Sequence, residues 1–448
     1  MTAKSVDMDT MPLRAGHFRV LAAASLGQLT GGALSTLIGI VLPMIQIIGR
    51  PHLSPMAQGA VAGTSLVGIM LGSIIFGQWS DRKGYLLPFR LCPAVILAAS
   101  LLAYFSASGA GLVAGLFFMG IGIGGEYSLD SDYISEIMPE KWRLTMVGCA
   151  KAATSVGNAA TAAACFFLLG KWDSPAMWNR LFLLVSGLAA IMLLCRVRFA
   201  QSPGWLMVHG REKEAEKAAR YFLGNDVLAD GLRGKTAVKG KWSALFAAGN
   251  MKKVIFSGIP WACEGVGVYG IGVFMPALIM ALGLETSSEG AYQRITESVR
   301  ITAVISLFIL AGFVAGIAML NRVRHLGMQT WGFVLSAAGI GVLLASHALH
   351  LPLWVSVLGF VIFELFLNAG PHLTTFVIPP QIYSVQERGA GTGIAAAFGK
   401  LGAVIGVLFM PVLLEKGGMD AVLWTVIAVL LAGAAVSAIW GRRVIPRR

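Results

Sequence analysis

Apolar residues occur along this chain in runs that are too long for the core of a water-soluble protein. A bilayer core about 30 Å thick is crossed by a helix of about 20 apolar residues, and twelve stretches of the sequence meet that length. The pattern therefore predicts an all-α membrane protein with twelve transmembrane helices. The predicted spans are residues 18–48, 58–79, 88–108, 110–137, 144–170, 180–200, 253–284, 299–320, 328–347, 352–379, 389–414 and 418–441.

One long polar segment, residues 201–252, interrupts the pattern between the sixth and seventh spans. It contains REKEAEKAARYF, whose alternating charges are typical of a solvated amphipathic helix. We predict a six-helix bundle over 1–200, a cytoplasmic linker over 201–252 and a second six-helix bundle over 253–448. The halves repeat weakly, since Ser135–Gly148 aligns with Pro380–Gly393 at an offset of 245 residues. Parallel repeats of this kind are typical of transporters.

The composition and the charge support this prediction. Of the 448 residues, 56% are hydrophobic and 13% are charged, against about 25% charged in soluble domains. The net charge of +13 follows the positive-inside rule: with both termini in the cytoplasm, 27 of the 35 basic residues lie on that side. Only Lys151 and Lys400 lie inside spans. We therefore predict a multi-pass protein of the cytoplasmic (inner) membrane with no nucleic-acid partner.

The fourth span carries four acids on two helix faces. At 100° per residue, Glu126 and Asp130 share one face, while Asp132 and Glu136 share another. Carboxylates inside a membrane are costly and usually face a cavity or a partner. We expect the first pair to face a water-filled pathway and the second to face neighbouring helices near the cytoplasmic end. The alternative is that all four acids form static salt bridges.

Further charges lie near the middle of the membrane. At 1.5 Å per residue, three ionisable residues lie about 16 Å into their spans, and these are Glu264, Glu364 and Lys400. A buried charge without a partner is costly. The natural pairings are Lys151 with Glu126 or Asp130, and Lys400 with Glu364 or Glu264. Lys400 is either structural or a counter-ion for an anionic substrate.

Polar and aromatic residues near the same depth are the other candidates for contacting a substrate. In the tenth span, Glu364, Asn368 and Thr375 lie on one face with His372 at its margin. His372 could instead only make a hydrogen bond near the helix end, and aromatic side chains at helical spacing are more often packing elements. The substrate-binding candidates are Lys151, Lys400, Trp261, Tyr269, Asn368, His372 and Gln28.

Three sequence motifs resemble a known family. The loop after the second span, GQWSDRKGYLL, matches the G-x-x-x-D-R-x-G motif of the major facilitator superfamily at Gly77, Asp81, Arg82 and Gly84. GGEYSLDSDYISEIMPEKWR resembles the fourth span and following loop of the sugar-porter and metabolite:proton symporter branches. QSPGWL is similar to their ESPRWL segment after the sixth span, with the acid and the arginine replaced.

The resemblance implies the major facilitator fold and a cytoplasmic gating network that latches the outward-open state. Its members here are Gly77, Asp81, Arg82, Gly84, Asp132, Glu136, Arg143 and Arg388. The alternative is a set of static salt bridges at helix ends. The chain also departs from the sugar porters: its first span has no acid, and Leu116 aligns with their arginine in the fourth span. The usual sugar/proton couple is therefore absent.

Other classes of protein are disfavoured. The seven histidines form no cluster, and the five cysteines have the spacing of neither a metal site nor a disulfide framework. No serine lies in a nucleophile-elbow pattern, and no phosphate-binding loop for ATP is present. A sensor would need a longer soluble domain than residues 201–252. We therefore expect neither an enzyme nor a sensor, and neither a cofactor nor a metal.

We predict an alternating-access secondary transporter that carries a small organic anion, a carboxylate metabolite, together with a proton. Glu126, Asp130, Glu264 or Glu364 would carry the proton, and Lys400 or Lys151 would meet the substrate. Protonation would break an internal ion pair and free the lysine. The expected partners are a small-molecule substrate, protons and lipid, and we expect a monomer. The alternatives are a sugar or polyol:proton symporter and, after that, a drug efflux antiporter.

Overall fold

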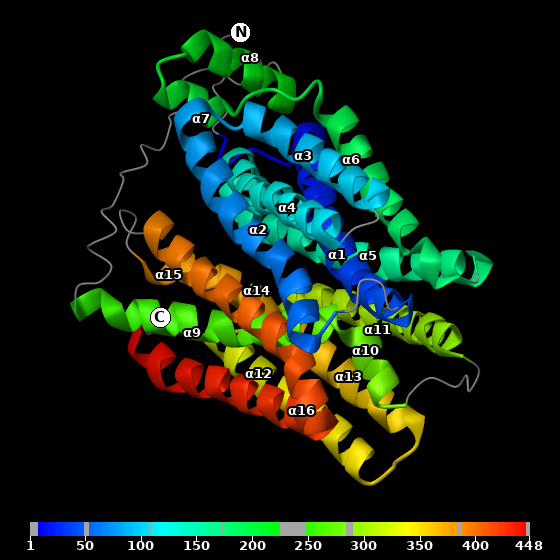
Figure 1. Cartoon of the computed structure of the whole chain (residues 1–448). Helices are drawn as coiled ribbons and strands as arrows, with labels where there is room; N and C mark the ends of the chain where they lie inside the picture. The colour runs from blue at the N-terminus through cyan, green and yellow to red at the C-terminus, as the bar shows by residue number, and fades with distance from the viewer. Residues whose placement is uncertain are drawn as a thin grey trace. The chain divides into compact units, whose positions relative to one another are not determined.

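The computed structural model describes residues 8–48, 53–106, 109–172, 174–224, 248–283, 290–383 and 388–444. Within these ranges the chain forms helices joined by short turns and contains no strand (Figure 1). Long apolar helices are the expected result for this sequence, because a helix satisfies its backbone hydrogen bonds within one segment and needs no water to do so.

The helices follow the predicted spans closely. Those of the first half are α1 (Ala15–Ile48), α2 (Pro55–Lys83), α3 (Leu86–Phe105), α4 (Gly109–Ile137), α5 (Glu140–Trp172), α6 (Phe182–Arg196), α7 (Pro203–Val208) and α8 (Glu212–Leu223). Those of the second half are α9 (Ala248–Gly265), α10 (Met275–Ala281), α11 (Ala291–Met319), α12 (His325–Ala348), α13 (Leu353–Ala369), α14 (Pro371–Val377), α15 (Pro379–Ile382) and α16 (Arg388–Val444).

Twelve membrane crossings fit this set of helices. In the described ranges, 11 helical segments are long and apolar enough to cross a membrane. The last of them, Gly391–Val444, has 54 residues and is interrupted at Gly418, whose φ is 67° and ψ −170°. It is therefore long enough for two crossings. The prediction of an all-helical fold with twelve spans is confirmed.

The chain forms two compact units. Unit 1 comprises residues 1–32, 67–157 and 182–237, and unit 2 comprises residues 33–66, 158–181 and 238–448. Helices α1, α2 and α5 each contribute one part to each unit, and α7 and α8 belong to unit 1. The domain boundaries at residues 200 and 252 remain a prediction, since the units follow spatial clustering and cut through three of the helices.

Helix α8, which the charge pattern predicts to be a solvated amphipathic helix, buries one of its faces in unit 1. Phe222 on this face is 3% exposed and packs against Tyr133 with ring centroids 6.1 Å apart. The backbone of α1 approaches it closely, because a Cβ on Gly16 would lie 1.5 Å from the carbonyl oxygen of Phe222. This segment of the predicted linker is therefore docked.

Glycines allow pairs of helices to touch through their backbones. In unit 1, a Cβ on Gly72 of α2 would lie 2.0 Å from the carbonyl oxygen of Ile121 on α4. In unit 2, a Cβ on Gly402 of α16 would lie 2.1 Å from the carbonyl oxygen of Ala262 on α9. Membrane helices associate through small residues in this way. The contact between α9 and α16 brings together two helices that carry predicted charges.

Besides the break at Gly418, two further interruptions of helix geometry lie within unit 2. Residues Val266–Ile271, which follow α9, form a π-helix. The tenth span breaks at Gly370, whose φ is −113° and ψ −99°, and Pro371, which has no backbone N–H, begins the next helix. Irregular backbone at membrane depth occurs in proteins where it is buried or lines a cavity, and π-helices are frequent at functional sites.

Candidate functional site

Unit 1 contains a buried group of charged side chains, which we call the unit 1 charge cluster: Glu126, Asp130, Arg196, Gln28 and Lys151. Glu126 and Asp130 lie one turn apart on α4 and are 0% and 1% exposed, so they share a face as predicted. That face meets other helices of the unit. A buried carboxylate needs a partner, and the structure supplies one.

Arg196, at the end of α6, is the partner of Glu126. Its Nη1 donates a hydrogen bond of 2.7 Å to Glu126 Oε1, and its Nη2 lies 2.7 Å from Glu126 Oε2. The same Nη2 is 3.6 Å from Asp130 Oδ1. The sequence analysis counts Arg196 among the basic residues at the cytoplasmic end of the sixth span, whereas its side chain is fully buried in the structure.

Backbone and aromatic groups hold the guanidinium of Arg196 in place. Nη1 also donates to the carbonyl oxygen of Phe89 at 3.0 Å, and Nη2 donates to that of Ala23 at 2.8 Å. The guanidinium carbon lies 3.6 Å from the centroid of the Phe89 ring. A planar guanidinium suits this combination of paired and stacked contacts. One signal for Arg196 was in the sequence: two buried acids in α4 need more cation than Lys151 alone provides.

Helix α1 contacts the cluster through Gly27 and Gln28. A Cβ on Gly27 would lie 2.5 Å from an oxygen of Asp130 and 2.5 Å from an oxygen of Glu126. Gln28 Nε2 donates to Asp130 Oδ2 at 3.2 Å. Gln28, which we predicted to bind substrate, is therefore engaged with an acid of the cluster in this structure.

Lys151 on α5 completes the cluster and is 8% exposed. Its ammonium lies 4.5 Å from the centroid of the Tyr127 ring and interacts electrostatically with Asp130. The pairing of Lys151 with an acid of α4 stays a prediction, for which this interaction favours Asp130. Glu126 instead forms its ion pair with Arg196.

In unit 2, two acids are linked through an amide and an imidazole, and we call this series the unit 2 file: Glu364, Asn368, His372 and Glu264. Asn368 Nδ2 donates to Glu364 Oε2 at 3.1 Å. Asn368 Oδ1 lies 2.8 Å from His372 Nδ1. His372 Nε2 lies 3.6 Å from Glu264 Oε1. All four side chains are buried, with exposures of 1% to 6%.

The helix break positions His372 in this file. His372 lies in the first turn of α14, four residues after Asn368 on α13, so the break at Gly370 falls between them. The predicted stripe places His372 at its margin, whereas in the structure it bridges Asn368 and Glu264. Thr375, the fourth member of the stripe, has no hydrogen-bond partner for its hydroxyl among the described residues.

Lys400 on α16 lies beside the π-helix. Its Nζ donates to the Tyr269 hydroxyl at 3.1 Å and lies 4.9 Å from the centroid of the same ring. Lys400 is half-buried and interacts electrostatically with Glu264, which is one of its two predicted partners. A lysine, a tyrosine hydroxyl and a carboxylate thus meet where α9 contacts α16.

Trp261 lies one turn before Glu264 and is 7% exposed. Its ring makes an edge contact with Phe376, with centroids 4.7 Å apart, and it packs on Gly399, where a Cβ would lie 2.4 Å from Trp261 Cδ1. This aromatic candidate is therefore a packing element in this structure, and it touches α16 at Gly399, the residue before Lys400.

The predicted gating network is only partly within the described residues, since the side chains of Asp81, Arg82 and Arg388 lie outside them. Arg143 Nη2 is 2.7 Å from Asp9 Oδ1. Glu136 accepts a hydrogen bond from Ser202. Each of these residues contacts a segment outside its own helix.

The other members of the network differ in how tightly they are held. Gly84 has φ of 89° and lies against the side chain of Gln201, which accepts hydrogen bonds from the backbone N–H groups of Tyr85 and Leu86 at 2.9 and 3.2 Å. A Cβ on Gly77 would lie 3.7 Å from the nearest atom, so there is room for one. Asp132 is exposed.

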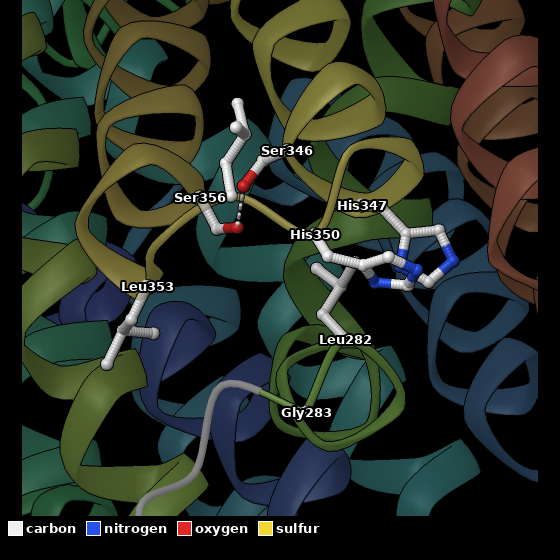
Figure 2. A pocket seen from close by; sticks show the side chains of 8 residues that line it. Leu282, Gly283, Ser346, His347, His350, Leu353 and Ser356 are labelled. Carbon is white, nitrogen blue, oxygen red and sulfur yellow. Dashed lines mark hydrogen bonds between the residues drawn. The ribbon is translucent and has the colours of Figure 1, made fainter.

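A pocket of about 220 Å³ lies at the turn between α12 and α13. Figure 2 shows His347 and His350 beside it, together with the hydrogen bond of 2.7 Å between Ser346 and Ser356. None of the predicted site residues lines it. In the part of the chain that the structure describes, no three His, Cys, Asp or Glu residues are arranged to hold a metal ion.

Comparison with known proteins gives consistent matches over nearly the whole chain. The sequence model described as "Sugar (and other) transporter" matches residues 21–441. The inner membrane metabolite transport protein YgcS of Escherichia coli (strain K12) is 27% identical over 98% of this chain and 94% of its own. The repressible high-affinity phosphate permease of Neurospora crassa is 25% identical over 89% of this chain and 78% of its own.

A solved structure shares the fold. The proton:xylose symporter XylE, a major facilitator superfamily protein from E. coli, superposes with a TM-score of 0.77 at 17% sequence identity, over 96% of each chain. All of these proteins carry solutes, so the fold and the relatives agree on transport.

Proposed function

Because this chain belongs to the sugar (and other) transporter family, we propose that it imports a small organic anion, a carboxylate metabolite, together with a proton. It would work as a monomer by alternating access in the cytoplasmic membrane, with both termini in the cytoplasm. Two similar proteins support the location and the coupling, since one is an inner membrane metabolite transport protein and another a proton:xylose symporter.

The observation that carries the anion proposal is Lys400. A charged ammonium inside a long apolar helix is energetically unfavourable, and such residues are usually functional. Lys400 is half-buried and donates to the Tyr269 hydroxyl. A carboxylate substrate would accept from both groups, because an ammonium has three donors and a tyrosine hydroxyl has one. Glu264 compensates the charge of Lys400 when no substrate is bound.

The coupling proposal rests on exchange of partners. When a carboxyl group binds a proton, it stops attracting the cation beside it, and that cation becomes available for the substrate. Glu264 would release Lys400 in this way, and Asp130 would release Lys151. Glu364 is a third buried acid. Removing a carboxyl group from water favours its protonated form in general. Proton binding and anion binding would then support one another.

Two other substrates have specific support. The phosphate permease among the relatives makes inorganic phosphate a second anion that the Lys400 and Tyr269 pair would suit. A neutral sugar or polyol is the alternative of a different class, and it is supported by the name of the family and by the xylose symporter.

The test is uptake by the purified protein in liposomes, with an inward proton gradient and a panel of carboxylates, inorganic phosphate and neutral sugars. We expect accumulation of at least one carboxylate, which collapses when a protonophore removes the gradient. Thermal stabilisation by the same compound in detergent would give an independent measure of binding. Accumulation of neutral sugars alone would contradict the anion proposal, and accumulation that ignores the protonophore would contradict the coupling.

A further inference from the structure

Of the two acids in the unit 1 charge cluster, we propose that Asp130 binds and releases the proton while Arg196 keeps Glu126 ionised throughout. This deepens the proposed function, on which it rests for the role of the proton in transport. The proposal is carried by the unequal contacts that one arginine makes with two carboxyl groups four residues apart.

Glu126 is held as an anion. Both nitrogens of the guanidinium end lie 2.7 Å from its oxygens, and the carbonyl oxygens of Ala23 and Phe89 prevent the guanidinium from turning away. Protonating Glu126 would leave Arg196 buried with only one counter-charge, the Asp130 carboxylate at 3.6 Å without a hydrogen bond, in place of two contacts of 2.7 Å, which is unfavourable. Arg196 itself does not lose its proton in proteins.

The negative charge of Asp130 is stabilised by fewer contacts than that of Glu126. Its Oδ1 lies 3.6 Å from Arg196, which is too far for a hydrogen bond, and it has no hydrogen-bond donor among the described residues. Its Oδ2 accepts only from a neutral amide, Gln28, in the contacts that the structure shows. Buried acceptors left without donors are unfavourable.

Gln28 suits both forms of Asp130. Its Nε2 donates to the carboxylate in this structure, and its Oε1 is a second buried acceptor with no partner among the described residues. An amide offers donors on one side and an acceptor on the other. A protonated Asp130 would become a donor beside an amide that also carries an acceptor, so Gln28 offers a group suited to each form of Asp130.

The other ionisable groups around Asp130 agree with this assignment. Glu126 lies near it on the same face, and Cys92 of α3 is the nearby thiol. Lys151 of α5 interacts electrostatically with Asp130 and balances it in the ionised state. Protonation of Asp130 would thus release Lys151 toward an anion, while the pair of Glu126 and Arg196 stays intact.

The test is a pH titration of the full chain in lipid nanodiscs, followed by infrared difference spectroscopy of the carboxyl C=O stretch. We expect a band of a protonated carboxyl group that moves when aspartate is labelled with carbon-13, stays when glutamate is labelled, and is lost in Asp130→Asn. The control Glu214→Gln removes an exposed acid on α8 and should leave the band unchanged. The proposal is overturned if no band moves with aspartate labelling, if that band survives in Asp130→Asn, or if a protonated-carboxyl band that moves with glutamate labelling is lost in Glu126→Gln.

The labelling experiment uses the unaltered chain and no substrate, so it does not depend on the folding of a variant or on the proposed function. That function fails separately, if wild-type liposomes accumulate no anion under a proton gradient. Where they do, Asp130→Asn should still exchange the anion across the membrane at equal pH but lose accumulation at least tenfold. Full accumulation by Asp130→Asn would overturn the assignment and leave the proposed function in place.

Discussion

The two units hold buried acids in different ways. In the unit 1 charge cluster, Arg196 touches Glu126 directly and both side chains are fully buried. In the unit 2 file, Glu264 and Glu364 are connected through a neutral amide and a histidine, and the half-buried Lys400 of another helix interacts electrostatically with Glu264. A guanidinium fixed at two nitrogens keeps its partner, whereas an ammonium on a flexible stem can change partners.

Replacing Arg196 should have the largest effect. Arg196→Gln leaves Glu126 and Asp130 without their shared cation, and losing one partner of a buried ion pair costs about 3–5 kcal/mol. We expect a large fall in the thermal denaturation midpoint in detergent. Arg196→Lys, which keeps the charge but not the paired geometry, should recover part of the loss. An unchanged midpoint for Arg196→Gln would mean that the cluster is not a stabilising ion pair.

Replacing Lys400 should change binding more than folding. Lys400→Gln keeps a polar side chain next to Tyr269, so we expect little change in the denaturation midpoint. Loss of a charged hydrogen bond to the substrate, about 1.5–3 kcal/mol, would weaken apparent affinity roughly 10- to 100-fold in exchange assays. The matched variant Lys400→Arg should retain more affinity. Equal affinity in Lys400→Gln and wild type would show that this lysine does not meet the substrate.

The smallest effect is expected at Thr375, the member of the predicted stripe whose hydroxyl makes no described hydrogen bond. Thr375→Val removes a buried hydroxyl that has no described hydrogen-bond partner, so stability should stay the same or rise by up to about 1 kcal/mol. Thr374→Val is the matched control, because that hydroxyl donates to Gly370 and Gln329 and its loss should cost about 1 kcal/mol. Denaturation midpoints of the two variants measure the difference. A larger fall in the denaturation midpoint for Thr375→Val than for Thr374→Val would show that the Thr375 hydroxyl does make a stabilising hydrogen bond.

Much of the scaffold could be predicted from the sequence because the bilayer imposes a length on every helix. The twelve spans and the shared face of Glu126 and Asp130 follow from helix periodicity and depth. These properties depend on one helix at a time, or on the general cost of a charge in hydrocarbon.

The partners of the charges could not be predicted, because they depend on which helices are neighbours. Arg196 ends an apolar run and is followed closely by Arg198, so it has the sequence pattern of a topology signal. Only the approach of α1, α3 and α4 around it shows that it is buried. The role of His372 was missed for a similar reason, since the break at Gly370 decides where its ring lies.

The closeness of Gly27 to both acids of unit 1 has a consequence for how this sequence can diverge. Because any side chain at position 27 would collide with an oxygen of Glu126 and an oxygen of Asp130, three positions on two helices are free to vary only together. A lineage that loses both acids gains room for alanine on α1, and one that keeps either acid keeps the glycine. We therefore expect positions 27, 126 and 130 to covary among proteins that share an ancestor with this chain.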